Sequence, residues 1–323
     1  MMQEHLKKSL YVAPMMGKTD SHFRYLARLI SKQVHLYSEM ITTGAILYGD
    51  AEKILSYNQE ENPLSLQLGG SDPIALKDCV LIAKEKKYDE VNLNVGCPSN
   101  RVQKGNFGAC LMEQPKVVAE CVKMMSGLGI PITVKCRIGT DILNSYGDLS
   151  NFIKIVSDQG GCETFIIHAR IANLNGFTPK QNREIPPLKY YLVHDIKKEF
   201  PKNKIIINGG IDSIEGIRQQ LNHVDGVMVG RSAYSNPWLL SEFDNIISVG
   251  SNQAKTRYDV SLLYLDYVKK KHEEGVSLYK TMRHLLGLYR GIKGGKKMRR
   301  YISENISNPN IAKYMFSDIQ NFF

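Results

Sequence analysis

The sequence has few cysteines, and their spacing argues against two common uses of this residue. The six cysteines are scattered, none stands in a CxxC motif, and no Cys/His group has the spacing of a structural zinc site. This pattern is typical of a protein in a reducing compartment rather than of a disulfide scaffold. Long hydrophobic runs are also missing, since residues 1–9 are polar and no apolar run approaches the length of a membrane span. We therefore expect a cytoplasmic protein.

Several catalytic motifs are absent as well. The chain contains no P-loop and no GxSxG motif, and no GxGxxG opens the first crossover. These absences argue against P-loop nucleotidases, α/β-hydrolases and Rossmann dinucleotide-binding folds. No pair of carboxylates follows the β-rich runs described below, so glycosidase chemistry has no support.

Within the first 233 residues, short β-rich runs alternate with helical stretches long enough to cross back over a sheet. This alternation predicts parallel βαβ units, and eight runs favour a (β/α)8 barrel over an open doubly wound sheet. The predicted strands are 10–15, 36–41, 64–68, 90–95, 132–138, 164–169, 204–208 and 226–229. The predicted helices are 21–31, 73–85, 115–125, 150–159, 188–199 and 213–221.

The periodicity changes after Pro237. Residues 258–272 and 278–292 have helical spacing, and shorter helices are expected over 297–306 and 310–321. On the second of these helices, one apolar stripe carries Met282, Leu285, Leu286, Tyr289 and Ile292. We therefore expect a barrel domain over residues 1–245 and a small all-helical domain over residues 246–323, with a hinge near 250–253.

The formal net charge of +10 is concentrated in the predicted helical domain. Residues 255–300 carry 13 Lys/Arg and four Asp/Glu, whereas residues 1–254 carry 28 basic and 26 acidic side chains. A solvated basic face is one interpretation of such a segment. The concentration of charge favours the other, a polyanionic partner that contacts the C-terminal part.

The carboxyl ends of barrel strands form the active site, so Cys97 is the first candidate residue. It follows the run 90–95 and stands between Gly96 and Pro98, which end the strand. A reactive thiol and a buried structural cysteine both fit this position, because free cysteine is among the most buried residue types.

Two ionisable residues end neighbouring strands. Lys135 lies in an otherwise apolar run, where a charge costs free energy unless it is paired, and Glu39 is a possible partner. His168 follows three apolar residues and fits either a functional group or a satisfied core histidine.

The last two predicted strands end in glycine. Asn208, Gly209 and Gly210 follow the seventh strand, and Gly230 and Arg231 follow the eighth. A tight turn would explain the glycines alone. Barrels often bind phosphate with these two loops, where glycine lets the backbone approach an anion and arginine offers two donors, so we predict a phosphate site.

Several motifs together resemble those of the tRNA-dihydrouridine synthases, from about residue 10 to 303. The matching motifs are APM (13–15), LQLG (66–69), GCPS (96–99), RVQKG (101–105), GACLM (108–112), VKCR (134–137) and IHAR (167–170). The segments FTPKQNREIPP (177–187) and HLLGLYRG (284–291) are similar to the A-type members, which act on uridines 20 and 20a of the D-loop.

The resemblance implies an FMN-binding barrel with a helical tRNA-binding domain and NADPH as electron donor. FMN would deliver hydride to C6 of the uracil, and Cys97 would protonate C5 as general acid. The implied flavin-binding residues are Pro14, Met15, Met16, Gln67, Lys135, His168, Asn208, Gly209, Gly210, Gly230 and Arg231. The implied tRNA-binding residues are Asn94, Lys180, Arg183, Lys296 and Arg299.

The chain departs from the family pattern near its C-terminus and after the IHAR motif. Lys296 and Met298 stand where the family has arginine and tryptophan, and residues 171–173 read IAN where the family often has KAW. These differences concern RNA docking rather than the reaction. The alternatives are an FMN barrel that reduces a free pyrimidine or another small molecule, and a non-catalytic RNA-binding protein.

Overall fold

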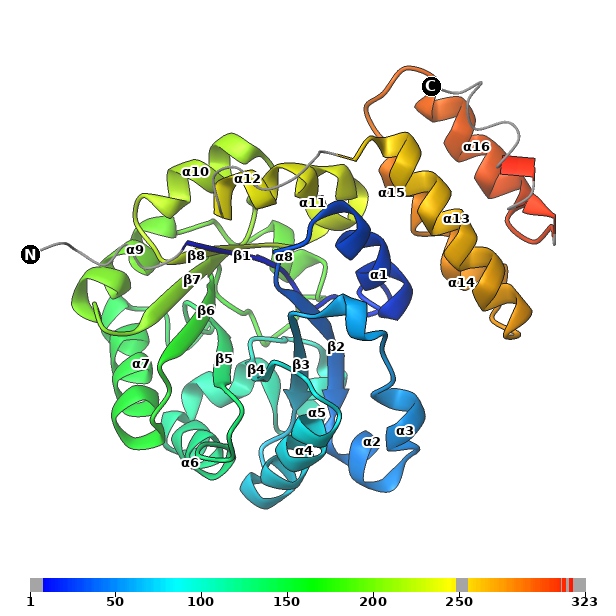
Figure 1. Cartoon of the computed structure of the whole chain (residues 1–323). Helices are drawn as coiled ribbons and strands as arrows, with labels where there is room; N and C mark the ends of the chain where they lie inside the picture. The colour runs from blue at the N-terminus through cyan, green and yellow to red at the C-terminus, as the bar shows by residue number, and fades with distance from the viewer. Residues whose placement is uncertain (1–7, 248–254, 309, 312–313, 316–323) are drawn as a thin grey trace, which may run out of the picture.

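An eight-stranded parallel barrel forms the centre of the molecule (Figure 1). The computed structural model describes residues 8–247, 255–308, 310–311 and 314–315. The strands are β1 Ser9–Val12, β2 Leu36–Thr42, β3 Leu64–Gly69, β4 Glu90–Val95, β5 Ile132–Arg137, β6 Thr164–His168, β7 Lys204–Asn208 and β8 Gly226–Val229. Each pairs with its neighbours in parallel, in the order β1-β8-β7-β6-β5-β4-β3-β2. The sheet closes where Val12 N–H donates to the His35 carbonyl and His35 N–H donates to the Leu10 carbonyl, both at 2.9 Å. The predicted fold class is confirmed.

Helices surround the barrel and connect its strands (Figure 1). The α-helices of the barrel are α1 Ser21–Ile30, α2 Thr43–Tyr48, α3 Ala51–Ile54, α4 Pro73–Glu85, α5 Asn100–Lys104, α6 Pro115–Met125, α7 Tyr146–Gly160, α8 Gln181–Glu184, α9 Tyr190–Glu199, α10 Ile214–Leu221, α11 Arg231–Ser235 and α12 Phe243–Ile247. Three 3₁₀ helices are η1 Gln59–Glu61, η2 Gly108–Glu113 and η3 Pro237–Glu242. The C-terminal helices are α13 Arg257–Glu273, α14 Leu278–Met282, α15 Leu285–Leu288 and α16 Gly295–Asn305.

The local sequence explains where the longer helices begin. Helix α4 begins with a proline, whose missing N–H is no loss in the first turn, after the N-cap residue Asp72. Helices α7 and α13 each begin with a capping box, formed by Ser145 with Asp148 and by Thr256 with Asp259.

The barrel interior is apolar on one side and polar on the other. Inward residues of β1, β2, β6, β7 and β8, together with Ala13 directly after β1, form one apolar cluster: Tyr11, Ala13, Tyr37, Ile166, Ile206 and Met228. On β3, β4 and β5 the leucines and valines alternate with the polar residues Ser65, Gln67, Glu90, Asn92, Asn94, Thr133 and Lys135. Because side chains alternate across a strand, one set packs against the outer helices while the polar set faces the interior.

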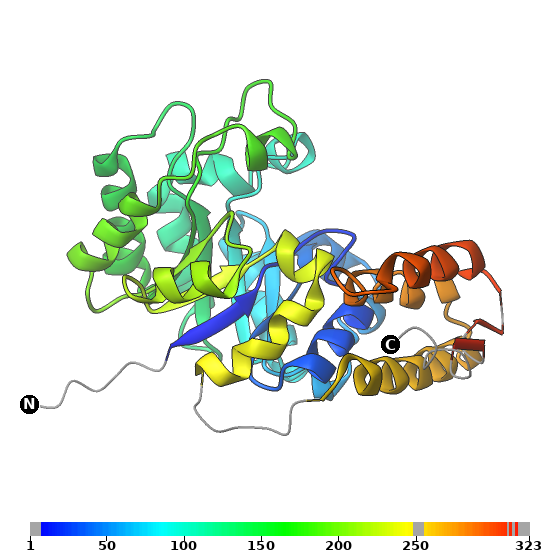
Figure 2. The ribbon, with the colours of Figure 1, turned by 90° about the horizontal axis from the view of Figure 1, so that it is seen from above.

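The C-terminal helices pack against α1 and extend outward beyond it (Figure 2). Leu26 of α1 belongs to the same hydrophobic cluster as Tyr264 and Val268 of α13. The rings of Tyr25 and Tyr267 stack with their centroids 4.0 Å apart. This packing fixes the C-terminal helices beside the barrel.

One helix of the sequence-based prediction is wrong. Residues 278–292 form two short helices, α14 and α15, instead of one. The backbone tightens between them, where His284 N–H bonds to the Thr281 carbonyl, three residues back. The stripe residues still serve the C-terminal core, since Met282, Leu285 and Tyr289 are buried in it. The expected hinge at 250–253 and most of the expected helix 310–321 lie outside the described residues.

In the part of the chain that the structure describes, no helix is both long enough and apolar enough to cross a membrane.

Candidate active site

A cavity of about 1180 Å³ opens at the carboxyl ends of the strands. Because all eight strands are parallel, the loops that follow them meet at this one rim. The lining includes fourteen predicted site residues: Pro14, Met15, Met16, Gln67, Asn94, Cys97, Lys135, His168, Arg183, Asn208, Gly209, Gly210, Gly230 and Arg231. Arg290, in the turn after α15, also lines the cavity.

The loop that carries Cys97 is held by hydrogen bonds from below. Asn94 Oδ1 accepts the backbone N–H groups of Gly96 at 3.1 Å and of Cys97 at 3.0 Å. Arg137 Nε donates to the Gly96 carbonyl at 2.9 Å, and Ala109 N–H donates to the Cys97 carbonyl at 2.9 Å. The thiol itself is half-buried and lines the cavity. Cys97 is therefore fixed through its backbone while its side chain stays accessible.

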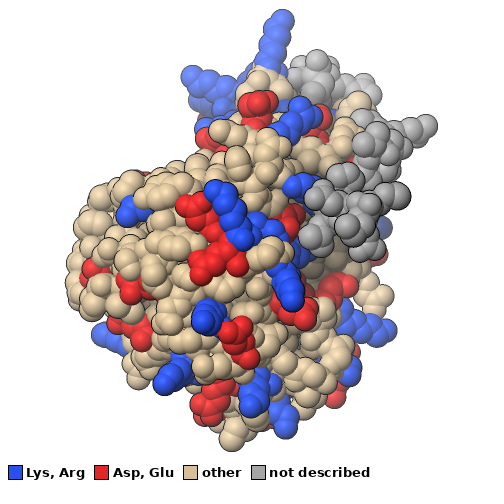
Figure 3. Space-filling model, turned by 90° about the vertical axis from the view of Figure 1, so that its left-hand side faces the viewer, with Lys and Arg blue, Asp and Glu red and all other residues tan. Residues whose placement is uncertain are grey.

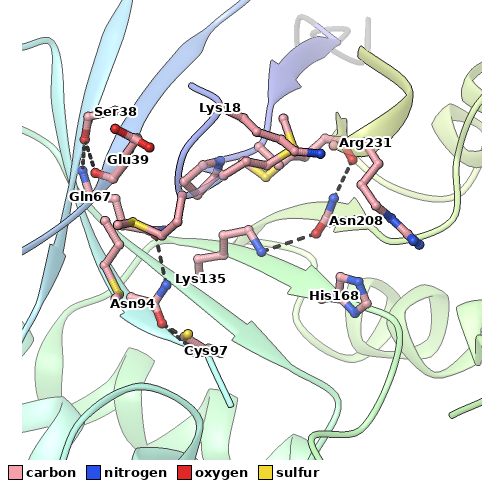
Figure 4. Close-up of a pocket in the computed structure, with 18 of the residues that line it drawn as sticks. Lys18, Ser38, Glu39, Gln67, Asn94, Cys97, Lys135, His168, Asn208 and Arg231 are labelled. Carbon is pink, nitrogen blue, oxygen red and sulfur yellow. Dashed lines mark hydrogen bonds between the residues drawn. The ribbon is translucent and has the colours of Figure 1, made fainter. Parts of the chain in front are cut away.

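Lys135 extends across the cavity floor toward Asn208 (Figure 4). Its Nζ donates to Asn208 Oδ1 at 3.2 Å, and Asn208 Nδ2 donates in turn to the Met228 carbonyl at 2.7 Å. The ion pair with Glu39 is not formed, because the Glu39 carboxylate accepts the Gly17 N–H instead. Burial and the neighbouring Arg137 lower the pKa of Lys135 to about 8. A cation without a carboxylate partner is suited to an anionic ligand.

His168 lies beside Asn208 and Arg231 on the same side of the cavity (Figure 4). Burial lowers its pKa well below the ordinary value, and the cationic Arg137 and Lys135 lower it further, so the ring is neutral at pH 7. Its Nδ1 is buried and has no hydrogen-bond partner among the described residues. An orphaned ring nitrogen in a cavity wall is available to a ligand.

The loops after β7 and β8 bring backbone close to the cavity. Gly209 and Gly210 have φ of +114° and +69°, in the region that favours glycine. A Cβ at Gly210 would lie 2.4 Å from Leu188 Cδ1, so no other residue fits there without rearrangement. Arg231 follows β8 and reaches across to α8, where its guanidinium contacts Glu184 at 3.0 Å.

The sequence profile described as Dihydrouridine synthase (Dus) matches residues 11–320. The chain belongs to the dihydrouridine synthase family. Among its relatives, the tRNA-dihydrouridine(20/20a) synthase of Vibrio cholerae is 50% identical over 301 residues, 93% of this chain and 92% of the relative. The enzymes of the same name from Salmonella typhimurium and Escherichia coli K12 are 51% and 50% identical, over 91% and 93% of this chain and 89% and 87% of theirs.

The cavity fits the FMN that enzymes of this family use. It offers the cationic Lys135, the orphaned Nδ1 of His168, and the two glycine-containing loops with Arg231. A planar ring with one phosphate would satisfy all of these groups.

The remaining predicted flavin-binding residues lie in two places. Met15 and Met16 belong to the loop after β1, at the rim of the cavity, whereas Gln67 lies in the barrel interior. Met15 N–H donates to Thr19 Oγ1 at 2.9 Å, which holds the loop at the rim, and Met16 is 66% exposed there. Gln67 is 1% exposed, and its amide bonds Asn92 and Asn94 on either side. One N–H and one oxygen lone pair of Gln67 remain for a ligand.

The residues predicted to bind RNA fall into three positions. Asn94 is 8% exposed and its amide bonds within the protein, as described above, although one edge lines the cavity. Arg183 is exposed on α8 and lines the cavity, whereas Lys180 precedes α8 and does not belong to the lining. Lys296 and Arg299 lie on α16, away from the cavity. Their role in RNA binding stays a prediction.

Three residues of α16 bear on the predicted RNA surface, and their surroundings differ. Met298, where the family has tryptophan, is 1% exposed and packs in the C-terminal core, so this difference concerns packing rather than a stacking surface for RNA. Arg299 donates to the Tyr289 carbonyl at 2.7 Å and therefore also stabilises the fold. Lys296 is exposed.

Lys18 and Glu39 also line the cavity, although neither was predicted as a site residue. Lys18 lies over the ring of Tyr234, 4.8 Å from its centroid, and burial together with Arg183 and Arg231 lowers its pKa. Glu39 holds the β1 loop through Gly17 N–H. The signal for Lys18 was its place directly after the breaker-rich end of β1. The register shift in β2 that turns Glu39 toward the cavity has no signature in the sequence.

Proposed function

We propose that this protein reduces the C5–C6 double bond of uridines 20 and 20a in tRNA to dihydrouridine, with FMN as cofactor and NADPH as reductant. The observation that carries the proposal is the arrangement of Cys97 across the same cavity from Lys135, His168 and the two glycine-containing loops. The relatives that share about half of its sequence bear the name of this activity.

The residues of the cavity would bind FMN at two ends. Gly209, Gly210, Gly230 and Arg231 supply backbone N–H groups and a guanidinium for the phosphate. Lys135 and His168 would contact the ring, where the positive charge of Lys135 favours the reduced, anionic form. When bound, FMN supplies the hydride for C6 of the uracil.

Cys97 would supply the proton for C5. Its thiol is the half-buried group at the end of β4, and its loop is fixed by Asn94 and Arg137. A positioned general acid contributes about 10²- to 10⁴-fold to a rate. The uracil must leave its stack to reach this depth, as in other enzymes that modify bases.

The distribution of charge favours different roles for the barrel and the C-terminal helices. We propose a catalytic domain over residues 1–245 and a tRNA-binding domain over 246–323, although Ile246 and Ile247 at the end of α12 still pack against the barrel core. On the side of the barrel shown in Figure 3, Lys and Arg are interspersed with Asp and Glu. The net +9 within residues 255–300 would attract the phosphates of tRNA. The substrate implies a cytoplasmic enzyme.

A single assay tests the proposal. The protein is incubated with NADPH and unmodified tRNA. The tRNA is then digested, and mass spectrometry of the fragments detects a gain of two hydrogens per target uridine. Gain at positions 20 and 20a supports the proposal. Reduction of free uracil or uridine without reduction of tRNA would favour the small-molecule reductase, and tRNA binding without reduction would favour a non-catalytic RNA-binding protein.

A further inference from the structure

A continuous chain of hydrogen bonds runs through the polar side of the barrel, from Cys97 to the opposite end. Its upper part starts at Asn94, whose Oδ1 accepts from the Cys97 loop. Asn94 Nδ2 donates to Gln67 Oε1 at 2.9 Å, and Gln67 Nε2 donates to Asn92 Oδ1 at 2.8 Å. Three amide side chains are thus joined head to tail.

The lower part ends on a carboxylate. Asn92 Nδ2 donates to Thr133 Oγ1 at 2.8 Å, and Thr133 Oγ1 donates to Glu90 Oε1 at 2.9 Å. The same oxygen of Glu90 accepts from Ser65 Oγ at 2.8 Å and from Tyr37 at 2.7 Å. Burial and the nearby Glu90 raise the pKa of Tyr37 well above its ordinary value, so its hydroxyl keeps its proton and donates.

The groups at the two ends of the hydrogen-bond chain determine which atom of each side chain donates and which accepts. An amide side chain alone can turn either its oxygen or its nitrogen toward a neighbour. At the upper end the backbone N–H groups can only donate, so the oxygen of Asn94 must face the Cys97 loop. At the lower end the Glu90 carboxylate can only accept, so Thr133 must donate to it and accept from Asn92. The orientation of the Gln67 amide, which faces the cavity, is thereby fixed from both sides.

Every link of the chain is buried. Gln67, Asn92 and Thr133 are 1%, 0% and 2% exposed, so their hydrogen-bonding groups are largely shielded from solvent. Thr133 and Glu90 line a separate cavity at the opposite end of the barrel and do not line the active site. Glu90 and Asn94 are four residue steps apart along β4, a span of about 13 Å.

We propose that Glu90 is a positioning residue for the active site. Through Thr133 and Asn92 it sets which groups Gln67 presents to the flavin and how Asn94 holds the Cys97 loop. The inference rests on the proposed function for the identity of that flavin, while the hydrogen-bond chain itself is a property of the protein. Glu90 acts only through other residues and touches neither substrate nor cofactor.

The test compares two hydroxyl groups that donate to the same Glu90 oxygen. Thr133→Val keeps the shape of the side chain but breaks the chain to Gln67. Ser65→Ala is the matched control, because Ser65 is equally buried but lies on a branch that leads to His35, at 2.6 Å. Thr133→Ser restores the hydroxyl and should rescue the first variant.

Three measurements report on the active site rather than on stability. They are the midpoint potential and visible spectrum of bound FMN, the rate at which iodoacetamide alkylates Cys97 in the absence of tRNA, and the single-turnover rate of uridine reduction. We expect Thr133→Val to shift the potential, to change the alkylation rate and to slow reduction by about three- to tenfold, the effect of one buried hydrogen bond. Ser65→Ala should stay within about twofold of the unmodified protein.

The proposal is overturned if Thr133→Val leaves all three measurements unchanged, if Ser65→Ala changes them equally, or if Thr133→Ser fails to restore them. If Thr133→Val does not fold, Thr133→Ala takes its place with the same expectations, because it also removes the hydroxyl that joins Asn92 to Glu90. Failure of the unmodified protein to reduce tRNA would overturn the proposed function alone. The alkylation rates of the variants would still decide the role of Glu90.

Discussion

Asp20 accepts a hydrogen bond from His284 across the boundary between the barrel and the C-terminal helices, with 2.9 Å between Oδ1 and Nε2. Arg283 contacts the other oxygen of the same carboxylate. Burial alone would raise the pKa of Asp20, but the hydrogen bond and charge of His284 and the hydrogen bonds from Phe23 N–H and Arg283 outweigh it, so the pKa is lowered well below its ordinary value. This carboxylate joins the C-terminal helices to the loop after β1, which lines the active site.

Replacing Asp20 by asparagine should weaken the contact between the barrel and the C-terminal helices while it preserves the N-cap of α1. Asp20 also caps α1, since its Oδ1 accepts the Phe23 N–H at 3.0 Å. Asp20→Asn keeps a good N-cap but removes the charge, and we expect it to lower the free energy of unfolding by about 1–3 kcal/mol, the usual effect of leaving a buried group without its partner. Asp20→Ala should cost about 1 kcal/mol more through loss of the cap. Denaturant unfolding at pH 7 measures both.

The lowered pKa of Asp20 also determines how its contribution to the free energy of unfolding depends on pH. The ionised carboxylate stabilises the folded state above the unfolded pKa near 4, and this contribution is lost as the pH falls below that value. The stability difference between the unmodified protein and Asp20→Asn should therefore shrink in acid. A difference that is constant from pH 7 to pH 3 would contradict the assignment.

Cys97→Ala should retain FMN and tRNA but lose turnover. Removal of a general acid costs about 10²- to 10⁴-fold in rate, whereas NADPH oxidation needs no proton from this thiol. Single-turnover reduction of tRNA measures the half-reaction that needs Cys97. NADPH oxidation in the absence of tRNA measures the half-reaction that does not.

The control for Cys97→Ala is Cys110→Ala. Cys110 is also half-buried, but its thiol donates to the Phe107 carbonyl at 3.2 Å, and burial raises its pKa. We expect near-normal turnover in this variant. Loss of dihydrouridine formation in Cys110→Ala and not in Cys97→Ala would show that the wrong thiol has been assigned.

Lys135 should make flavin binding depend on pH. Its pKa of about 8 in the protein lies below that of a free lysine, because burial and Arg137 disfavour the charged form. An anionic ligand favours that form, so FMN affinity should fall as the pH rises through 8. Lys135→Met should bind FMN more weakly at pH 7 and remove this step. Fluorescence titration of FMN from pH 6 to 9.5 measures both, and a step of equal size in the variant would rule out Lys135 as its origin.

Regular elements could be predicted from the sequence where local signals coincide with packing. The strands β4, β7 and β8 and the helices α4 and α6 have the predicted bounds, because apolar runs or an initial proline mark them. The short helices α2, α3, α5 and α8 were missed, since they lie in loops and lack an amphipathic repeat. Prediction therefore failed mainly in the loops that surround the active site.

The site residues at strand ends could be predicted because a parallel barrel brings those ends together. Their partners could not. That Lys135 bonds Asn208 rather than Glu39 depends on the register of β5 against β7 and on the bulge in β2. The alternating polar positions of β3, β4 and β5 were visible in the sequence. Their connection into one chain follows only from the register that sets Gln67 beside Asn92 and Asn92 beside Thr133.

The C-terminal helices should supply most of the tRNA affinity, and Lys296 is the residue that tests this most directly. It is exposed on α16, whereas Arg299 on the same helix bonds the Tyr289 carbonyl. Lys296→Ala should therefore weaken tRNA binding without loss of stability, and Arg299→Ala should reduce both. Each lost phosphate contact should flatten the slope of log affinity against log salt by about 0.7–0.9.

The matched control is Lys154→Ala, which removes an exposed lysine from α7 on the far side of the barrel. Filter binding of tRNA between about 50 and 300 mM salt measures the affinity of all three variants. The same data give the slope of log affinity against log salt. The visible spectrum of FMN and NADPH oxidation should not change in any of them. If Lys154→Ala flattened the slope as much as Lys296→Ala, the tRNA would bind the barrel surface and not the C-terminal helices.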